Sequence, residues 1–491
     1  MKKNKEKNKI VLIPINQGFV VRYFLQTDIF KKLQENNYTI ILLVPNPQDP
    51  FFESYKKYKN IIIEKYEIQK CSEYLKFHKI ERWISQTKRF ILNGKYNIQT
   101  VKDIYTAFLK DNKYNFSKGR KQIKKLAMIF FIIIARHLKM IRKIVLFFEQ
   151  LFYSPPLHQK IFNQYNPDLL IVSSLGTFDY DQFLMREAKK YNVKVTTIVL
   201  SWDNTTTRGM AGTTPDYIVA WTENMKRELI ELNDLPSRKI FVGGVAHFDH
   251  YYNNSTFVSR AELCKTLGLD LNKKILFFAT KSPNGYAWNA DIAKYILEAI
   301  SKNEIVESCQ LLVRLHPIYY RRQNGNYVFQ PFLDQFEKLK KQFSGLIINK
   351  PEMSSKYFNY SMPSNEIKLL ASILKCSDVV INMFSTLNLE ACIFDIPIVN
   401  VCFEGESYSG PSKARYNIAM DEAQTHNQRI VQSGAIKIVR NKTQLIDGIN
   451  AALFSPHIGR EGRKFIKETE CGPFPGQAGK HIAQYIENIL H

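Results

Sequence analysis

The chain has 491 residues, 45% of them hydrophobic and 23% charged, which describes a globular protein too long for one ordinary core. Lys and Arg number 69 against 45 Asp and Glu, so the net charge is +24 and we expect an acidic partner: nucleotide phosphates, anionic lipid or nucleic acid. The seven cysteines are odd in number and scattered, which argues against a disulfide framework and against a metal site.

The N-terminal segment lacks the pattern of a secretory signal. Residues 1–9 are charged, and the apolar run at 10–15 is short and ends at turn residues. The longest apolar run, 126–135, falls well short of the roughly twenty residues that a membrane-spanning helix needs. We therefore expect a cytoplasmic protein.

Alternating strands and helices are predicted for the first domain, residues 1–252. The predicted strands lie at 10–14, 39–44, 61–63, 169–173, 193–200, 217–220 and 240–242, and the predicted helices at 23–33, 181–191 and 224–232. The β-α-β order predicts a parallel sheet that binds ligands at the edge where its strands end. Gly18 and Arg22 follow the first strand, so we predict that they contact an acceptor substrate.

A basic helical insertion is predicted at about 64–160. Between 118 and 148 there is no acidic residue, whereas Lys and Arg alternate with aliphatic and aromatic residues. The basic positions include Lys121, Lys124, Lys125, Arg136, Lys139, Arg142 and Lys143. This pattern is typical of helices that lie in the headgroup layer of an anionic membrane, and it predicts a peripheral protein on the inner face of the membrane. The alternative is a pair of core helices with a solvated basic face.

The second half of the chain repeats the alternation. Strands are predicted at 274–279, 310–315, 346–348, 379–381, 398–401 and 435–439, and helices at 291–301, 333–343 and 366–374. A second domain at 260–475 thus follows a polar linker near 253–259, and a C-terminal helix occupies 476–491. The predicted fold class is α/β: two Rossmann-like parallel-sheet domains that face a cleft, with a basic helical insertion in the first.

Four groups of polar side chains follow strands of the second predicted domain. They are Lys281 with Ser282, Arg314 with His316, Ser385 with Thr386, and Glu390 one turn further on. Cations, an imidazole and hydroxyls at a helix start suit a diphosphate, and a carboxylate beside them can accept both hydroxyls of a ribose. The pattern predicts a nucleotide site, although Ser385 alone could simply cap its helix.

Two stretches here resemble a known family. Arg314-Leu-His316-Pro317 and Ser377-Asp378-Val-Val-Ile381-Asn-Met-Phe-Ser385-Thr386-Leu-Asn-Leu-Glu390-Ala391 resemble the donor domain of B-type glycosyltransferases, which have the GT-B fold. The most similar branch includes CDP-glycerol glycerophosphotransferases and enzymes that build bacterial surface polysaccharides. Residues 215–223 and 239–249 resemble the end of the family's acceptor domain. The resemblance implies that His316, Ser385 and Thr386 contact the donor phosphates and that Glu390 is positioned for the ribose.

Asp203 is the candidate catalytic base. It follows a predicted strand of the first domain, and it could deprotonate an acceptor hydroxyl if burial raises its pKa. It could equally cap the following loop, and Asp179 and His247 are rival candidates. No metal motif of the Asp-x-Asp kind stands out between the two predicted sheets, so we predict a metal-independent site in which Lys281 and Arg314 stabilise the leaving diphosphate. Inversion and retention at the anomeric centre both stay open.

These features predict a glycosyltransferase without a cofactor, which moves a sugar from a nucleotide-sugar donor to a hydroxyl acceptor, a lipid-linked or polymeric surface glycan. One alternative is a CDP-glycerol-type glycerophosphotransferase, in which the attacked atom would be phosphorus. Another is a sugar-nucleotide 2-epimerase of the same fold, for which the basic insertion has no obvious use. From other classes, a non-catalytic scaffold stays open, whereas no recognition motif supports a nucleic-acid partner.

Overall fold

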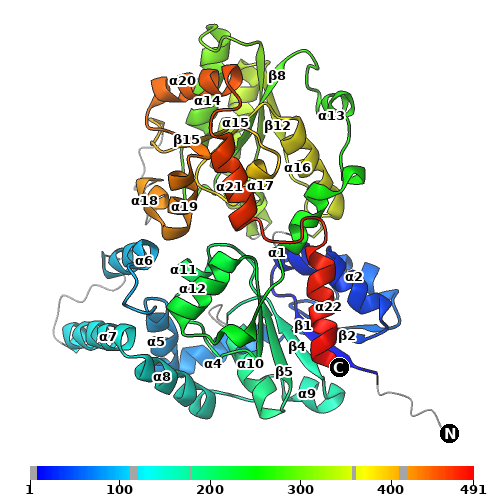
Figure 1. Ribbon diagram of the computed structural model, residues 1–491, viewed down its shortest axis with the longest axis vertical. Coiled ribbons are helices and arrows are strands. Elements are labelled where there is room, and N and C mark those ends of the chain that lie inside the picture. Colours follow the sequence, from blue (N-terminus) through cyan, green and yellow to red (C-terminus); the bar gives the residue numbers. More distant parts are fainter. Residues whose placement is uncertain (1–7, 111–119, 176–179, 324, 356–360, 408–417) are drawn as a thin grey trace. The chain divides into compact units, whose positions relative to one another are not determined.

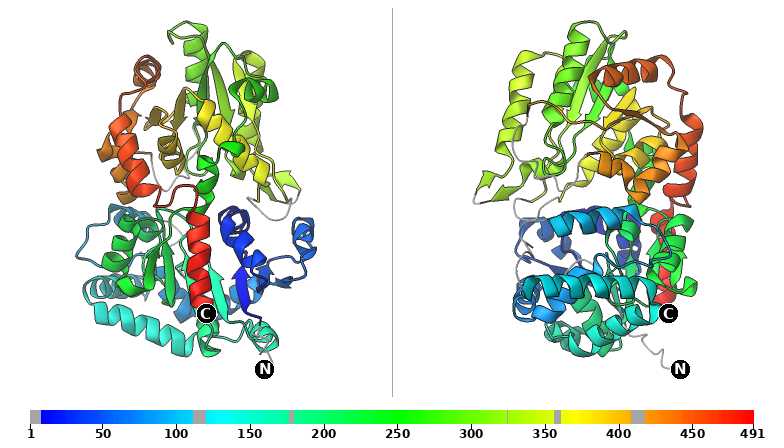
Figure 2. Two further views of the ribbon diagram at one scale, coloured as in Figure 1. Left: turned by 45° about the vertical axis from the view of Figure 1, so that its right-hand side comes forward. Right: turned by 90° about the vertical axis from the view of Figure 1, so that its left-hand side faces the viewer.

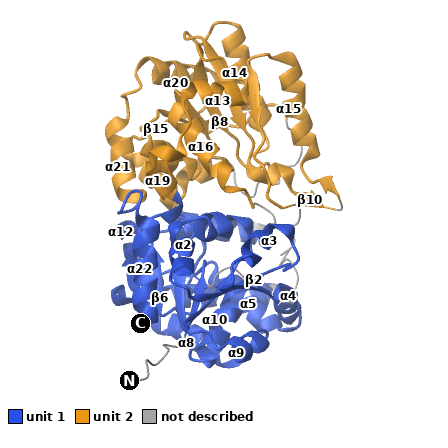
Figure 3. Ribbon diagram, turned by 90° about the vertical axis from the view of Figure 1, so that its right-hand side faces the viewer, with its two compact units in different colours: residues 1–247, 472–491 blue, residues 248–471 orange. Residues whose placement is uncertain are grey.

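The computed structural model describes residues 8–110, 120–175, 180–323, 325–355, 361–407 and 418–491. They form two compact units (Figure 3). Unit 1 comprises residues 1–247 and 472–491, and unit 2 comprises residues 248–471. The chain therefore returns to unit 1 for its last segment, to which the sequence analysis assigned no domain.

Unit 1 contains a seven-stranded sheet in the order β3-β2-β1-β4-β5-β6-β7, with every pair of neighbours parallel. Its strands are β1 Ile10–Pro14, β2 Thr39–Val44, β3 Ile61–Lys65, β4 Leu169–Val172, β5 Lys194–Ile198, β6 Tyr217–Ala220 and β7 Ile240–Val242. Its helices outside the insertion are α1 Gly18–Val20, α2 Asp28–Glu35, α3 Pro50–Lys56, α9 Gln159–Tyr165, α10 Asp181–Lys190, α11 Asn204–Thr207, α12 Glu223–Asn233 and α22 Ala478–Leu490. Figure 1 shows these strands lying between helices, and the central strands are continuous apolar runs because both of their faces are covered.

The predicted helical insertion is confirmed, and it lies between β3 and α9. It consists of α4 Ile68–Phe77, α5 Lys79–Lys88, α6 Gln99–Lys110, α7 Arg120–His137 and α8 Lys139–Phe152. None of the helices in the described part of the chain is both long enough and apolar enough to cross a membrane.

The prediction of one continuous helix at 23–33 is wrong, because the segment is divided into two helices. The chain instead forms a short π-helix at Val21–Leu25 and then α2, with a break at Thr27. Thr27 turns its hydroxyl onto the carbonyl of Phe24, at 2.8 Å, and takes extended backbone angles as the N-cap of α2. Threonine competes with helical hydrogen bonding in this way, so the apolar periodicity continues across a real helix boundary.

Unit 2 contains a six-stranded parallel sheet in the order β12-β9-β8-β13-β14-β15. Its strands are β8 Lys274–Ala279, β9 Cys309–Arg314, β12 Leu346–Asn349, β13 Val379–Asn382, β14 Ile398–Val401 and β15 Ile436–Val439, and β10 Arg322–Gln323 pairs separately with β11 Asn326–Tyr327. Its helices are α13 Arg260–Leu267, α14 Asn289–Ser301, α15 Gln330–Gln342, α16 Ser364–Cys376, α17 Leu387–Ile393, α18 Ile418–Ala423, α19 Thr425–Ser433, α20 Lys442–Phe454 and α21 Arg460–Glu470. Together the two sheets confirm the predicted pair of Rossmann-like domains.

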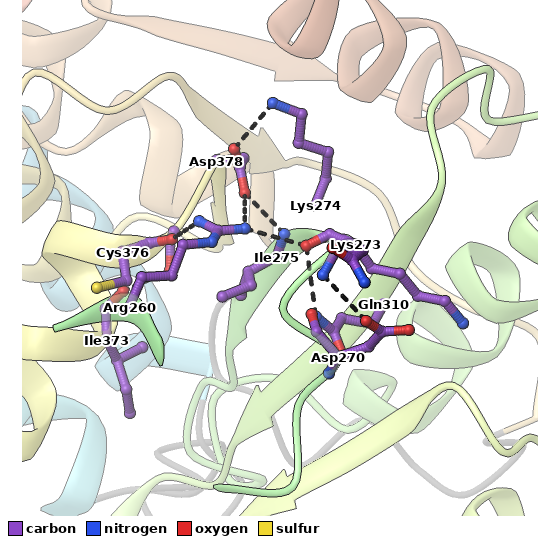
Figure 4. A network of polar contacts seen from close by, with 11 residues as sticks. Arg260, Asp270, Lys273, Lys274, Ile275, Gln310, Ile373, Cys376 and Asp378 are labelled. Atoms are coloured by element: carbon purple, nitrogen blue, oxygen red, sulfur yellow. Dashed lines mark hydrogen bonds and ion pairs between the residues drawn. The ribbon is translucent and has the colours of Figure 1, made fainter. Parts of the chain in front are cut away.

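A polar network fixes the amino ends of the two central strands of unit 2 (Figure 4). The Asp378 carboxylate accepts from the backbone N–H of Ile275 at 2.8 Å and from the Arg260 guanidinium at 3.0 Å. Arg260 also donates to the carbonyls of Lys273, at 3.0 Å, and Cys376. Because this network sets the register of β8 against β13, it fixes where both strands end at the opposite edge of the sheet.

Candidate functional site

The strand order of unit 2 creates a topological switch point. The first strand in sequence, β8, lies between the second, β9, and the fourth, β13. The loops after β8 and β13 therefore leave toward opposite faces of the sheet, and open α/β sheets bind ligands in the crevice between such loops. Lys281 and Ser282 lie in the first of these loops and Ser385 and Thr386 in the second. The structure thus brings two of the predicted groups to the same point.

Lys281 connects the two loops. Its backbone N–H donates to the Asn289 side chain at 2.9 Å, which ties the loop after β8 to the start of α14. Its ammonium group lies 3.5 Å from the carbonyl oxygen of Met383, at the end of β13, and forms an ion pair with Asp421 of α18. Ser282 closes the loop, because its carbonyl accepts from the N–H of Gly285 at 2.9 Å. A cation is therefore held at the switch point, with a carboxylate as its present partner.

His316 lies beside this loop in a defined tautomer. Its backbone N–H donates to the hydroxyl of Thr280 at 2.9 Å, and its Nδ1 accepts from the N–H of Ile318 at 3.1 Å. An accepting Nδ1 leaves the proton of the neutral ring on Nε2. Burial and the charge of Lys281 lower the pKa of His316 to about 4. At neutral pH the ring is therefore uncharged, and Nε2–H is its hydrogen-bond donor.

The loop that carries Ser385 and Thr386 is held in an unusual conformation. The hydroxyl of Ser385 accepts from the N–H of Leu387 at 3.3 Å, so the predicted capping role is present. Phe384, just before it, has φ of +34°, a region that a bulky side chain rarely adopts. Its N–H donates to the side chain of Asn400 at 2.9 Å. The surrounding structure therefore maintains the strain.

Three buried asparagines support this loop, and none of them was predicted from the sequence. Asn382, Asn388 and Asn400 are at most 1% exposed. Asn388 accepts from Asn382 at 2.8 Å and from Asn400 at 3.0 Å, and donates back to Asn400 at 3.1 Å. The partners are contributed by β13, α17 and β14. The sequence signal that could have found them is a polar residue in an apolar strand: Asn382 at the end of β13 and Asn400 within β14.

Arg314 and Glu390 are buried and have protein partners. Arg314 forms a 2.6 Å ion pair with Glu366 and also donates to Asn349, at the end of the neighbouring strand β12. Glu390 accepts a hydrogen bond from the hydroxyl of Tyr251. The strand that carries Asn349 lies on the far side of β9 from the switch point, so these contacts hold Arg314 and Glu390 without placing either side chain at it. Their contacts with a donor stay predictions.

In unit 1 the corresponding switch point lies between β1 and β4. Gly18 is buried in α1, which directly follows the loop after β1, and Arg22 lies in the π-helix Val21–Leu25 with its guanidinium 6.0 Å from the Tyr23 ring. The ring of Tyr23 contacts His247, with centroids 3.9 Å apart. This places His247, a rival candidate for the base, against the segment predicted to bind the acceptor, as a buried ring. The other rival, Asp179, lies outside the described residues.

Asp203 immediately precedes α11. Its carboxylate accepts from the hydroxyls of Ser201 and Thr207, the latter at 3.1 Å, and from the Asn204 side chain at 3.3 Å. These bonds within its own loop match the capping alternative. Asp203 is nevertheless only half-buried, so its role as a base stays a prediction.

A second acid, Asp181, lies at the switch point of unit 1. It starts α10 and accepts from the Tyr66 hydroxyl at 3.0 Å and from the Asn16 side chain, in the loop after β1, at 3.2 Å. Burial raises the pKa of Asp181 to about 6. Its neighbour Asp179 was the predicted candidate instead, because nothing in the sequence indicates that Tyr66 and Asn16 meet Asp181.

No protein-family model matches the sequence, and no curated protein matches it. Solved structures do match. The complex of S. aureus MnaA with UDP shares 11% sequence identity, over 98% of this chain and 97% of that chain, with a TM-score of 0.55. The UDP-GlcNAc 2-epimerase from Neisseria meningitidis bound to UDP-GlcNAc shares 13% identity, over 98% of this chain and 100% of that chain, with a TM-score of 0.50. At such identities the likeness concerns the fold, and this chain has the GT-B fold that its sequence predicts.

Proposed function

We propose that the chain is a nucleotide-sugar-dependent glycosyltransferase whose donor binds unit 2. The observation that carries the proposal is the gathering of Lys281, His316 and Ser385 around the switch point of a sheet with the doubly wound strand order. An ammonium, a neutral imidazole N–H and a hydroxyl are hydrogen-bond donors that suit a diphosphate. The solved structures with the same fold contain UDP or UDP-GlcNAc, which supports a nucleotide-sugar ligand.

In the proposed reaction an acceptor hydroxyl attacks the anomeric carbon and the bond from that carbon to the diphosphate breaks. Lys281 exchanges its partner Asp421 for the diphosphate, and His316 donates through Nε2–H. Both stabilise the negative charge of the leaving group without a metal ion or a cofactor. Asp203 accepts the proton of the hydroxyl if the reaction inverts the anomeric centre. Gly18 and Arg22 line the acceptor side.

The proposed acceptor is a lipid-linked or polymeric surface glycan, and the proposed location is the inner face of the membrane. The basic insertion supports both. Transfer of glycerol phosphate from a CDP-linked donor would use the same unit 2 site with attack at phosphorus, so it is a variant of the same proposal.

A 2-epimerase is the second candidate function, because the N. meningitidis structure with this fold is one. An epimerase acts on its nucleotide sugar alone, so the two candidates differ in whether an acceptor is consumed. Incubation with UDP-GlcNAc without an acceptor, followed by proton NMR, separates them. Appearance of the C2 epimer would replace the glycosyltransferase proposal.

The first test is a thermal-shift panel of UDP-, GDP-, dTDP-, CMP- and CDP-linked donors, including CDP-glycerol. A ligand that binds only the native state raises the melting temperature in proportion to the logarithm of its excess over Kd. We expect one nucleotide class to stabilise the protein and the substitution Ser385→Ala to reduce that shift. A panel without any shift contradicts the proposal, and a shift only with single-stranded oligonucleotides replaces it with nucleic-acid binding.

A further inference from the structure

Helices α7 and α8 are apolar on two opposite sides. Their inner side packs on unit 1: Met128, Ile132 and Ala135 of α7 are at most 5% exposed and belong to a cluster with Phe90 and Met210. A surface helix of a globular protein normally presents polar residues on the side away from its core. The outer sides of α7 and α8 do not follow this rule.

The outer side of the two helices carries a dense group of exposed apolar side chains, which we call the apolar face. Its members are Ile123, Leu126, Phe130, Ile133, Leu138, Met140, Ile144, Phe147, Phe148, Leu151 and Phe152. They are 11 of the 22 large apolar side chains that are strongly exposed in the described part of the chain. Such a concentration within 30 residues marks an interaction site rather than ordinary scatter. In Figure 1 and in both views of Figure 2 the two helices, coloured cyan, lie on the outside of unit 1.

Basic side chains border the apolar face. Lys124, Lys139 and Lys143 are exposed, each next in sequence or one turn away from its members. Between residues 118 and 148 the sequence contains no Asp or Glu, and the next carboxylate, Glu149, is 2% exposed and paired with Lys88 at 2.8 Å. The face is therefore apolar in its middle and positive at its border, with no carboxylate among its described residues.

A cavity lies on another side of α8, the side that carries Lys139, Arg142, Lys143 and Leu146. It has a volume of about 480 Å³, and its lining includes Lys139, Lys143 and Lys239, with Asp234 as the acidic member. Lys139 is 3.8 Å from Asp234, which in turn makes a 2.6 Å ion pair with Arg142. Positive charge predominates in this lining.

We propose that the apolar face docks onto an anionic phospholipid membrane. Phe, Ile, Leu and Met side chains enter the boundary between headgroups and acyl chains, while Lys124, Lys139 and Lys143 contact lipid phosphates. A second copy of the chain fits this face less well, because two faces of the same positive charge would repel each other. The alternative of a solvated basic face does not agree with the 11 exposed apolar side chains.

Membrane docking deepens the proposed function. It rests on that function in one respect only: a lipid-linked acceptor explains why the protein would bind a membrane. An acceptor anchored in the same leaflet would then be concentrated near unit 1. Lipid binding needs no donor, and donor binding by unit 2 needs no lipid. The two proposals therefore fail independently.

The test is co-sedimentation of the full-length protein with phosphatidylglycerol–phosphatidylcholine vesicles and with pure phosphatidylcholine vesicles. We expect binding to the anionic vesicles that weakens with salt. Combined substitution Phe130→Ser, Phe147→Ser and Leu151→Ser should raise the lipid concentration for half-binding at least tenfold. Combined substitution Lys124→Gln, Lys139→Gln and Lys143→Gln should do the same and reduce the salt dependence.

Matched controls change the same residue types elsewhere. Phe454, Ile458 and Phe465 of unit 2 are 91%, 64% and 54% exposed, and their combined change to Ser should leave vesicle binding unaltered. Lys265, Lys338 and Lys464 are exposed and serve as the Gln control. The proposal is overturned if the wild-type protein does not bind anionic vesicles at low salt, or if the controls weaken binding as much as the test variants. It is also overturned if sedimentation without lipid reveals a dimer that the Ser variant dissociates.

Discussion

His316 carries the most specific information at the scale of single residues, because its two ring nitrogens have separate tasks. Nδ1 accepts from Ile318 and keeps the loop in place, whereas Nε2–H is the donor proposed for the diphosphate. His316→Asn retains an acceptor for the loop and removes Nε2–H, because the shorter amide group does not reach the position of Nε2. We expect an unchanged melting temperature and roughly tenfold weaker donor binding, measured by calorimetry, because one hydrogen bond to a charged group is lost. His316→Ala should weaken binding and also lower the melting temperature.

The pH dependence of the same variant tests the tautomer. Because burial lowers the pKa of His316 to about 4, the ring stays neutral from pH 5.5 to 8. The ratio of wild-type to His316→Asn donor affinity should therefore be constant over this range. An ordinary histidine would become charged near pH 6.5 and would bind the diphosphate more tightly below it. A ratio that rises as the pH falls through 6.5 would contradict this assignment.

Asp181 makes a second prediction at this scale. Its pKa of about 6 in the folded protein exceeds the ordinary value near 3.8, so the folded state binds more protons than the unfolded state between about pH 4 and 6. The free energy of unfolding therefore falls as the pH rises through this window and levels off above it. Asp181→Asn removes this pH dependence, so the stability of the variant relative to wild type should rise by roughly 2.5 kcal/mol from pH 4 to 7. Denaturation at several pH values measures this change, and a constant difference would contradict it.

At the scale of elements, the loop between β13 and α17 depends on the buried asparagines. Asn400→Ala leaves the N–H of Phe384 and the side-chain NH2 group of Asn388 without the oxygen to which they donate. We expect a loss of about 2–3 kcal/mol and weaker donor binding, because Ser385 follows the loop as it relaxes. Thermal melting with and without donor measures both effects. Asn450→Ala is the matched control. Asn450 also hydrogen-bonds two different residues, through the backbone groups of Val306 and Glu304, but it does so at the surface, and its loss should cost little.

Features that depend on residues close together in the sequence could be predicted, whereas contacts between residues far apart in the sequence could not. β13 was predictable because a strand buried on both faces is a continuous apolar run bounded by polar residues. The positions of Lys281, His316 and Ser385 at one edge followed from strand ends in a parallel sheet. The hydrogen-bond and ion-pair partners of the site residues could not be predicted in this way. Asn388 meets Asn400, and Arg314 meets Glu366, only because the fold brings distant segments together. Asp378, part of the family-like stretch, acts at the opposite edge, where it sets the register of β8 and β13.

At the scale of the whole molecule, the chain closes unit 1 with its last helix. The helix was predicted at 476–491, but no local pattern revealed that it packs on unit 1. α22 packs against α2, and Lys194 of β5 donates to the carbonyl of Ile489 at 2.7 Å. Gly244 and Gly472, both with positive φ, allow the close backbone approach with which the chain re-enters unit 1. The stability of unit 1 therefore depends on a helix that lies more than 200 positions after the last strand of its sheet.

Substitution in α22 should show this dependence. Ile486→Ala empties a position that is fully buried in unit 1, and Leu445→Ala does the same in unit 2. Each should cost about 2–4 kcal/mol and lower one melting transition by roughly 5–10 °C. A bound donor should raise the melting temperature of unit 2 alone, which identifies the two transitions in a calorimetric scan. Ile486→Ala should then lower the transition that does not respond to donor, and Leu445→Ala the one that does. If Ile486→Ala instead lowered the donor-responsive transition alone, α22 would stabilise the donor-binding unit, and the assignment of the last helix to unit 1 would be wrong.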